Sequence, residues 1–145
     1  MSFFGAIDIS ASGLTANRTR MDVTAENLAN AETTRGANGQ PYQRQEVVLQ
    51  QAGGFGAMLA GAIGGQPAAA GGVQVAGIVN DPTPDQLVYD PGNPDADNKG
   101  YVKMPNVNSV TEMVDMIDES RSYEANVTAM DTSKTMYQKT LDLLK

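Results

Sequence analysis

The chain of 145 residues contains no cysteine and no histidine. The absence of cysteine excludes disulfides and thiolate chemistry, and it suits either a reducing or an oxidising compartment. The absence of histidine removes the side chain that most often serves as a general base or metal ligand near neutral pH. We therefore predict that the protein is not an enzyme and carries no cofactor and no metal ion.

Basic residues are also scarce, because 10 lysines and arginines stand against 17 acidic residues and leave a net charge of −7. This charge argues against nucleic acid or an anionic membrane as a partner. The sequence also contains no phosphate-binding glycine motif, so it does not predict a small-molecule substrate. No apolar run approaches the ~18 residues of a membrane-spanning helix. The N-terminus lacks the basic start and apolar centre of a secretory signal peptide, so we expect any export to proceed without one.

The strongest pattern that is present lies in the last forty or so residues. Two interleaved rows of mostly apolar side chains repeat every seven residues, which is the heptad pattern of a helix with one apolar stripe. The segment contains neither glycine nor proline, and Ser109 and Glu112 have the spacing of a capping box. The rows are Met116, Tyr123, Met130, Tyr137 and Leu144, and Met113, Ser120, Val127, Lys134 and Leu141.

This pattern predicts a helix from about residue 109 to residue 144, which would be about 50 Å long at 1.5 Å per residue. Such a helix is much longer than the ~11–12 residues of an average one. A chain of this size has too little material to cover the whole stripe. We therefore predict that the stripe pairs with other helices, on other chains.

Residues 3–30 form a second helical candidate with a narrower apolar seam. Ile7, Leu14, Met21 and Leu28 recur at intervals of seven, and Phe4 lies one turn earlier. Small residues beside the seam would let a neighbouring backbone approach closely. The seam favours a coiled coil, although a core helix of a small bundle is the alternative.

Between these helices the sequence predicts short strands. Residues 42–50, 73–79, 86–89 and 101–104 have β-favouring composition, and 53–72 is a Gly/Ala-rich segment that we expect to be a flexible loop. The predicted fold class is α+β, with long coiled-coil-forming helices at both ends of a small β-rich middle. We divide the chain into an N-terminal axial helix (1–34), the β-rich middle (35–105) and a C-terminal axial helix (106–145).

Some polar residues allow two interpretations. Asp81, Asp85, Asp90, Asp95 and Asp97 could bind Ca²⁺, but their spacing misses the EF-hand pattern and favours solvated turns. Asn27 and Asn30 could set the register of a buried seam, or they could tolerate a left-handed turn at a helix end. Arg18 and Lys134 interrupt the apolar rows, and either could pair with an acid on another chain or extend to solvent. Tyr123 and Tyr137 fit seam packing better than a ligand stack.

Two stretches resemble the bacterial flagellar basal-body rod proteins. One is Ser12–Ala16, Arg20–Ala25 and Asn27–Thr34, and the other is Leu87–Pro91, Pro94–Asp97 and Gly100–Asn108, followed by Glu112–Ile117 and Arg121–Asn126. The stretch 53–72 lies outside the resemblance. The motif positions are Asn27, Leu28, Ala29, Asn30, Thr33, Tyr101, Pro105, Asn106 and Asn108.

The resemblance implies a structural subunit of the proximal rod, which self-assembles through its terminal helices into a tube that transmits torque from motor to hook. It implies export through the flagellar type III apparatus without a cleaved signal, and assembly in the periplasm. Its implied partners are further copies of itself, neighbouring rod proteins, and membrane-ring and export-gate components. Two uncovered seams on one chain also suit head-to-tail contacts that build helical filaments.

The expected assembly interface consists of the seam residues of both helices. They are Phe4, Ile7, Leu14, Met21, Leu28, Met113, Met116, Tyr123, Val127, Met130, Tyr137, Leu141 and Leu144. The alternatives are another rod subunit of the same family and a soluble coiled-coil adaptor. A rod subunit adds to a tube, whereas an adaptor forms discrete small oligomers.

Overall fold

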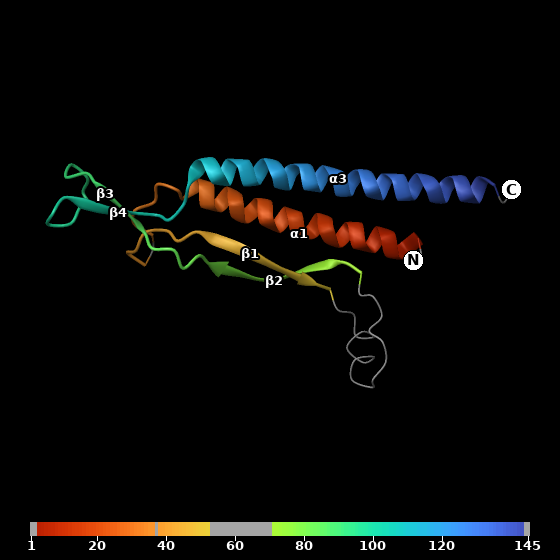
Figure 1. Cartoon of the computed structure of the whole chain (residues 1–145), viewed down its shortest axis with the longest axis horizontal. Coiled ribbons are helices and arrows are strands. Elements are labelled where there is room, and N and C mark those ends of the chain that lie inside the picture. The colour runs from red at the N-terminus through yellow and green to blue at the C-terminus, as the bar shows by residue number, and fades with distance from the viewer. Residues whose placement is uncertain (1–2, 37, 53–70, 144–145) are drawn as a thin grey trace, which may run out of the picture. The chain divides into compact units, whose positions relative to one another are not determined.

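The computed structural model describes residues 3–36, 38–52 and 71–143, and it has two long helices with a small β-rich middle between them in sequence (Figure 1). This confirms the α+β class. The elements are α1 (Phe3–Ala29), β1 (Gln45–Gln51), β2 (Val73–Asn80), β3 (Gln86–Tyr89), β4 (Tyr101–Met104) and α3 (Ser109–Asp142). Both predicted helices are therefore present with nearly the predicted bounds.

The strands form two sheets of two strands each, β1 with β2 and β3 with β4. In the second sheet the strands are antiparallel, and Val88 lies opposite Val102. The predicted strands at 86–89 and 101–104 match β3 and β4. Of the predicted loop at 53–72, residues 53–70 lie outside the described residues. Two-stranded sheets are marginal alone, so each depends on what packs against it.

The start of α3 differs from the predicted capping box. The Asn108 side chain caps the helix, because its Oδ1 accepts hydrogen bonds from the amides of Val110 (3.0 Å) and Thr111 (3.3 Å). The carboxylate of Glu112 is instead bonded to two side chains distant in sequence. The Ser109–Glu112 prediction was wrong because Asn108, one residue earlier, satisfies the first amides of the helix.

The end of α1 also differs from one interpretation of its asparagines. The described residues include no left-handed residue other than glycine, so Asn30 does not end the helix in that way. Its Nδ2 donates to the Glu26 carbonyl at 2.9 Å, and its Oδ1 accepts from the Thr33 hydroxyl at 3.2 Å. The side chain therefore closes the last turn by local hydrogen bonds.

The chain divides into two compact units. The first contains Met1–Thr19, Val48–Gly77 and Glu119–Lys145, and the second contains Arg20–Val47 and Ile78–Asp118. In the first unit, a Cβ added at Gly13 would lie 3.1 Å from Nδ2 of Asn126, so α1 and α3 approach closely there. The Ser12 hydroxyl also accepts from the amide of Val73 at 3.1 Å, which ties the start of β2 to α1.

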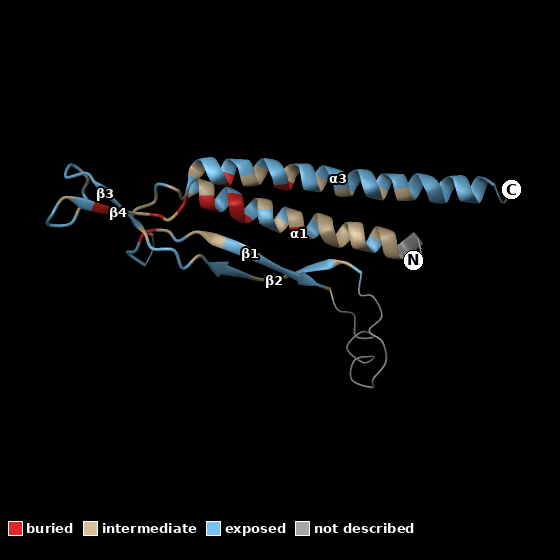
Figure 2. Cartoon of the chain, in the orientation of Figure 1, coloured by how far each residue is buried: buried red, intermediate tan, exposed pale blue. Residues whose placement is uncertain are grey.

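Few apolar side chains are buried (Figure 2). Among the described residues they are Ala16, Val23, Val102 and Val107, with the prolines Pro41 and Pro105. Thr24, Asn27, Glu112 and Glu119 are buried polar side chains. The second unit is thus centred on polar as much as on apolar groups, which requires those polar groups to be hydrogen-bonded.

The β3–β4 connection depends on one glycine. Gly100 has φ +81°, and a Cβ added to it would lie 2.9 Å from the ring of Tyr89. Its carbonyl accepts from the amide of Asp90 at 2.9 Å.

In the described part of the chain, neither helix combines the length and hydropathy needed to cross a bilayer.

Candidate functional site

Four side chains from three segments of the second unit form a hydrogen-bonded cluster that we call the polar hub: Asn27, Tyr42, Arg44 and Glu112. Asn27 is 1% exposed. Its Oδ1 accepts from the Tyr42 hydroxyl and from the Gln45 amide, both at 2.9 Å. Its Nδ2 donates to the Gln45 carbonyl at 2.8 Å and to Glu112 Oε2 at 3.1 Å. One side chain thereby joins α1, the start of β1 and α3.

Glu112 is a charged group at a buried position, with 1% of its residue surface exposed. Its Oε1 accepts from Arg44 Nε at 2.6 Å, while Oε2 is held by Asn27. A buried carboxylate is tolerated only when it is paired and hydrogen-bonded. The hydrogen bond to Glu112 is the main reason that the pKa of Arg44 is raised above its ordinary value.

Arg44 contacts two further carboxylates, at 3.6 Å from Asp81 and 3.6 Å from Asp115. Its backbone amide donates to Asn106 Oδ1 at 2.7 Å, and Asn106 Nδ2 donates to the carbonyls of Asp81 (3.3 Å) and Thr83 (3.0 Å). Asn106 therefore links the chain around Arg44 to the loop after β2. The hub and this link set the position of the start of α3.

Tyr42 completes the hub with a neutral phenol. Its pKa is raised to about 12, first because burial disfavours the phenolate and then because Glu26 and Glu112 add negative charge nearby. The proton is required for the hydrogen bond that Tyr42 donates to Asn27. A phenol of ordinary pKa is already protonated near neutral pH, and the hub extends the protonated range of Tyr42 to higher pH.

The predicted motif residues have unequal roles. Asn27 and Asn106 are bonded as described, Asn108 caps α3, and Pro105 is fully buried. Tyr101 is exposed and packs edge-to-face on Tyr89, with ring centroids 5.2 Å apart. Leu28 is half-buried and Ala29 exposed, while Thr33 lies at the turn after α1. The prediction missed Tyr42, Arg44 and Glu112 as site residues, because nothing in their spacing shows that they meet.

Four of the five aspartates between residues 81 and 97, all except Asp85, bind neighbouring chain atoms. Asp81 accepts from Thr83, and this hydrogen bonding is the main cause that lowers the pKa of Asp81. Asp90 accepts from the Gly92 amide and Asp97 from the amides of Lys99 and Tyr101. Asp95 accepts from the Thr34 hydroxyl and lies 3.6 Å from Arg35. In the described segments, no three acidic side chains converge as metal ligands.

The predicted seam of α1 is not the face that the chain buries. Ile7, Leu14, Met21 and Leu28 are all half-buried. Of the fully buried positions of α1, Ala16, Val23 and Asn27 fall on other faces of the helix, whereas Thr24 lies at the edge of the seam, beside Met21 and Leu28. Ala16 follows Leu14 by two residues, which is roughly 200° around the axis. The side chain of Phe4 lies outside the described part.

The predicted stripe of α3 divides in two. Met116, Tyr123 and Met130 are half-buried, whereas Met113, Val127, Tyr137 and Leu141 are exposed. The other covered row runs through Glu112, Glu119, Asn126 and Ser133 instead of the row predicted from Met113. Arg18 and Lys134 are exposed, and Leu144 lies outside the described residues.

Large exposed apolar side chains gather on two stretches of α3. We call the first, in the second unit, the early patch: Val110 (68% exposed), Met113 (47%), Val114 (52%) and Ile117 (54%). The second, in the first unit, is the late patch: Met136 (65%), Tyr137 (39%), Leu141 (44%) and Leu143 (87%). The early patch has the i, i+3, i+4, i+7 spacing of a helix face that packs on another helix. Exposed apolar side chains with this spacing form a face that another helix can cover.

Hydroxyl side chains on the same helix are bonded within it. Thr128, Thr132, Thr135 and Thr140 each donate to the carbonyl four residues earlier, at 2.8–2.9 Å, and Ser133 does so at 2.9 Å. Such bonds slightly weaken an isolated helix. They also leave few unsatisfied polar groups on this part of α3.

Comparison with known proteins gives consistent matches. Residues 7–39 match the family described as "Flagella basal body rod protein", and residues 98–143 match "Flagellar basal body rod FlgEFG protein C-terminal". The chain is 48% identical to the flagellar basal-body rod protein FlgC of Escherichia coli O6:H1, over 99% of this chain and 98% of that one. It is 47% identical to FlgC of Bacillus subtilis over the full length of both, and 43% identical to FlgC of Borreliella burgdorferi over 100% and 99%. The matched segments include both Asn27 and Glu112.

Proposed function

Because the chain belongs to the FlgC family of flagellar basal-body rod proteins, we propose that it is a structural subunit of the proximal rod, held there by its terminal helices. The observation that carries the helical part of this proposal is the exposure of the early and late patches of α3. Neither patch gains the free energy of apolar burial, roughly 25 cal/mol per Å², until a neighbour covers it.

The half-buried seam of α1 supports the same proposal. Its residues lie on a different face from the buried Ala16, Val23 and Asn27, so α1 can contact its own chain and a neighbour at once. Seams on both helices would then form coiled-coil contacts between subunits. The segments 1–34 and 106–145 would be the axial parts of the subunit, with 35–105 between them.

The polar hub supports a role for the second unit as a preformed block. A buried network with matched donors and acceptors specifies one arrangement of the segments that it joins. The start of α3 would therefore be fixed before assembly, and the early patch would be presented in a defined orientation. Transmission of torque from motor to hook requires such a fixed connection between a subunit and its neighbours.

The partners that we propose are further copies of the chain, neighbouring rod proteins, and membrane-ring and export-gate components at the rod base. We further propose that the subunit assembles in the periplasm after export through the flagellar type III apparatus. The proposed role involves no catalysis, cofactor or nucleic acid.

Electron microscopy of basal bodies from the native bacterium tests the function directly. A tag in the connection between β1 and β2 would be located with a labelled antibody fragment, with untagged basal bodies as the control. We expect label on the rod between the membrane ring and the hook. Label on no part of the rod, with the tagged chain recovered as discrete soluble oligomers, would favour an adaptor instead.

A further inference from the structure

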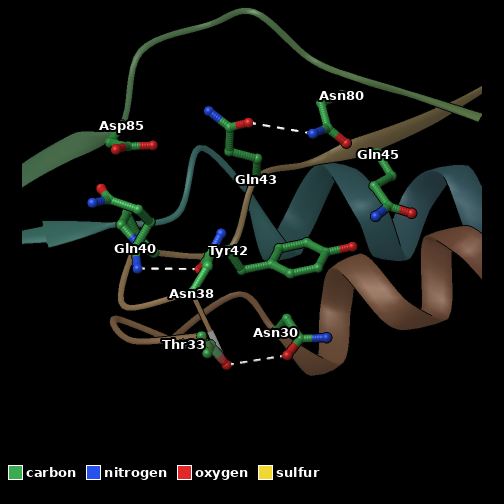
Figure 3. A pocket seen from close by; sticks show the side chains of 11 residues that line it. Asn30, Thr33, Asn38, Gln40, Tyr42, Gln43, Gln45, Asn80 and Asp85 are labelled. Atoms are coloured by element: carbon green, nitrogen blue, oxygen red, sulfur yellow. Dashed lines mark hydrogen bonds between the residues drawn. The ribbon is translucent and has the colours of Figure 1, made fainter.

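A polar hollow of about 550 Å³ lies within the second unit (Figure 3). It is bordered by the segment between α1 and β1 and by residues that follow β2. Most of its lining is carboxamide: Asn30, Asn38, Gln40, Gln43, Gln45 and Asn80. Among the described residues that line it, none is basic and one, Asp85, is acidic.

Asp85 has an unpaired hydrogen-bond acceptor at this hollow. Its Oδ1 is buried and has no hydrogen-bond partner among the described residues. Figure 3 shows the Asp85 side chain on the opposite side of the hollow from Asn30 and Thr33. A buried carboxylate oxygen without a donor is costly. The hollow therefore lacks a donor, and a positive charge there would be favoured.

Several other lining groups have their bonding already arranged. Asn80 Nδ2 donates to Gln43 Oε1 at 3.4 Å, the Gln40 amide donates to Asn38 Oδ1 at 3.2 Å, and Asn30 is bonded to Glu26 and Thr33. The hydroxyl of Tyr42 is directed to Asn27, so what this residue offers a ligand is its aromatic ring. An unmet acceptor in a lining that also contains an aromatic residue and amide groups distinguishes this hollow from a solvated turn.

We propose that this hollow receives the guanidinium group of an arginine presented by a neighbouring polypeptide. A guanidinium supplies five donors in a plane, pairs with a carboxylate through two of them, and stacks on aromatic rings. Carboxamide oxygens can accept its remaining donors. A metal ion fits less well, because Asp85 is the only carboxylate among the described lining residues.

The identity of the neighbour rests on the proposed function, since a subunit in a rod has other polypeptides against it. The chemistry of the hollow does not rest on it. Binding of the isolated group can therefore be measured on the unassembled chain, separately from rod assembly.

The test uses arginine capped at both ends as the probe, added to the full ¹⁵N-labelled chain and followed by the NMR signals of side-chain amides. We expect shifts at Gln40 and Asn80, with a dissociation constant on the order of millimolar. Capped citrulline has the same shape without the charge, and capped lysine has the charge without the planar fork. Both should bind more weakly than capped arginine.

The decisive variant is Asp85→Asn, which keeps the size of the side chain and removes the charge. We expect it to weaken binding of capped arginine about tenfold or more. Asp90→Asn is the matched control, because Asp90 does not line the hollow and asparagine can still accept from the Gly92 amide. It should bind as the native chain does.

Three results would overturn the inference: no shift with capped arginine, equal binding of capped citrulline, or equal binding by Asp85→Asn. Circular dichroism of each variant shows whether the fold is retained. Incorporation of the native chain into basal bodies is scored separately. A chain that assembles but does not bind capped arginine would end this inference and leave the rod function intact.

Discussion

At the scale of single residues, the second unit depends on a buried charge. Glu112 has one close cationic partner, Arg44 at 2.6 Å, and one amide partner, Asn27 at 3.1 Å. Removing either partner leaves the carboxylate buried without full compensation, which is more costly than never having formed the pair. Asn27 is the more demanding of the two partners, because it acts as donor and acceptor at the same time.

Asn27→Asp should therefore be strongly destabilising. The substituted carboxylate cannot donate to Glu112, and it places a second negative charge beside the first. We expect the free energy of unfolding to fall by about 3–5 kcal/mol, as measured by urea unfolding followed by circular dichroism.

Asn30→Asp is the matched control, since it makes the same change directly after α1, at a position that is less buried than Asn27. We expect a loss within about 1 kcal/mol, because the Asn30 bonds are local. Equal losses for the two variants would mean that the hub contributes no special stability.

The raised pKa of Tyr42 predicts that the free energy of unfolding depends on pH in the alkaline range. Its pKa is raised from 10.0 to about 12, so the folded state holds the proton more tightly than the unfolded state does. The stability that Tyr42 contributes is complete below about pH 10 and is lost as the pH rises toward about 12. The free energy of unfolding should therefore fall more steeply between these pH values in the native chain than in Tyr42→Phe.

Tyr89→Phe serves as the comparison, because Tyr89 is 64% exposed. It should show the same pH profile as the native chain. If Tyr42→Phe also follows the native profile, the phenol does not carry the dependence.

At the scale of elements, the two helices and the four strands could be predicted from the sequence. Heptad spacing without glycine or proline was enough for α3, and β-favouring composition between turns was enough for β3 and β4. The covered faces were harder. On α1 the burial of Asn27 depends on Tyr42 and Glu112, which are distant in sequence, so apolar periodicity could not reveal it.

The assignment of Glu112 shows the same limit. Its spacing from Ser109 is that of a capping box, yet its carboxylate is held by Arg44 from 68 positions away. Local patterns describe what a residue can do within one helix turn. They carry no information about the cation that a distant loop brings to it.

The β3–β4 connection gives a prediction at this scale. Gly100→Ala should destabilise the second unit by about 1–2 kcal/mol, because φ is +81° and the new methyl group would meet the ring of Tyr89. Gly92→Ala in the same connection is the control, since its Cβ would come no closer than 3.6 Å to another atom. Thermal unfolding by circular dichroism separates the two, and similar melting temperatures would contradict the role given to Gly100.

Charged substitutions on the α1 seam and on the early patch should block assembly without unfolding the second unit. Leu14→Asp on α1 and Val114→Glu on the early patch should leave the hub folded, because neither side chain is part of it. Both should prevent incorporation into basal bodies, since a charge would be buried at an interface. Incorporation is measured by immunoblot of purified basal bodies.

Thr15→Asp and Thr111→Glu are the matched controls, at exposed positions of the same helices, one residue after Leu14 and three residues before Val114. They should assemble more fully than their partners. Native levels of Leu14→Asp and Val114→Glu in basal bodies would refute the role of these faces.

At the scale of the whole molecule, the buried apolar residues are few for a chain of this length. Apart from two prolines, four are buried among the described residues, while many larger ones are exposed. The conformational entropy lost on folding is on the order of 1–2 kcal/mol per residue. A chain with so little apolar burial leaves part of its ordering to be stabilised by neighbours.

Hydrogen exchange can locate that part. Residues 134–142 of α3 are all exposed, whereas the side chains of Glu112 and Glu119 on its earlier turns are buried. In the unassembled chain, amides of 134–143 should exchange at least about tenfold faster than those of 112–119. Mass spectrometry of peptic fragments measures this, and in purified basal bodies the difference should shrink. Equal protection in the unassembled chain would show that the late patch needs no neighbour to be ordered.

The hydrogen bonds that hydroxyl side chains donate within α3 affect how easily water can be removed from its surface. Thr128, Thr132, Ser133, Thr135 and Thr140 already donate to carbonyls of their own helix. Water bound to that surface can therefore leave without stranding these donors. These hydroxyls can stay hydrated while the helix is alone, and they can be dehydrated at little cost when another surface closes over them.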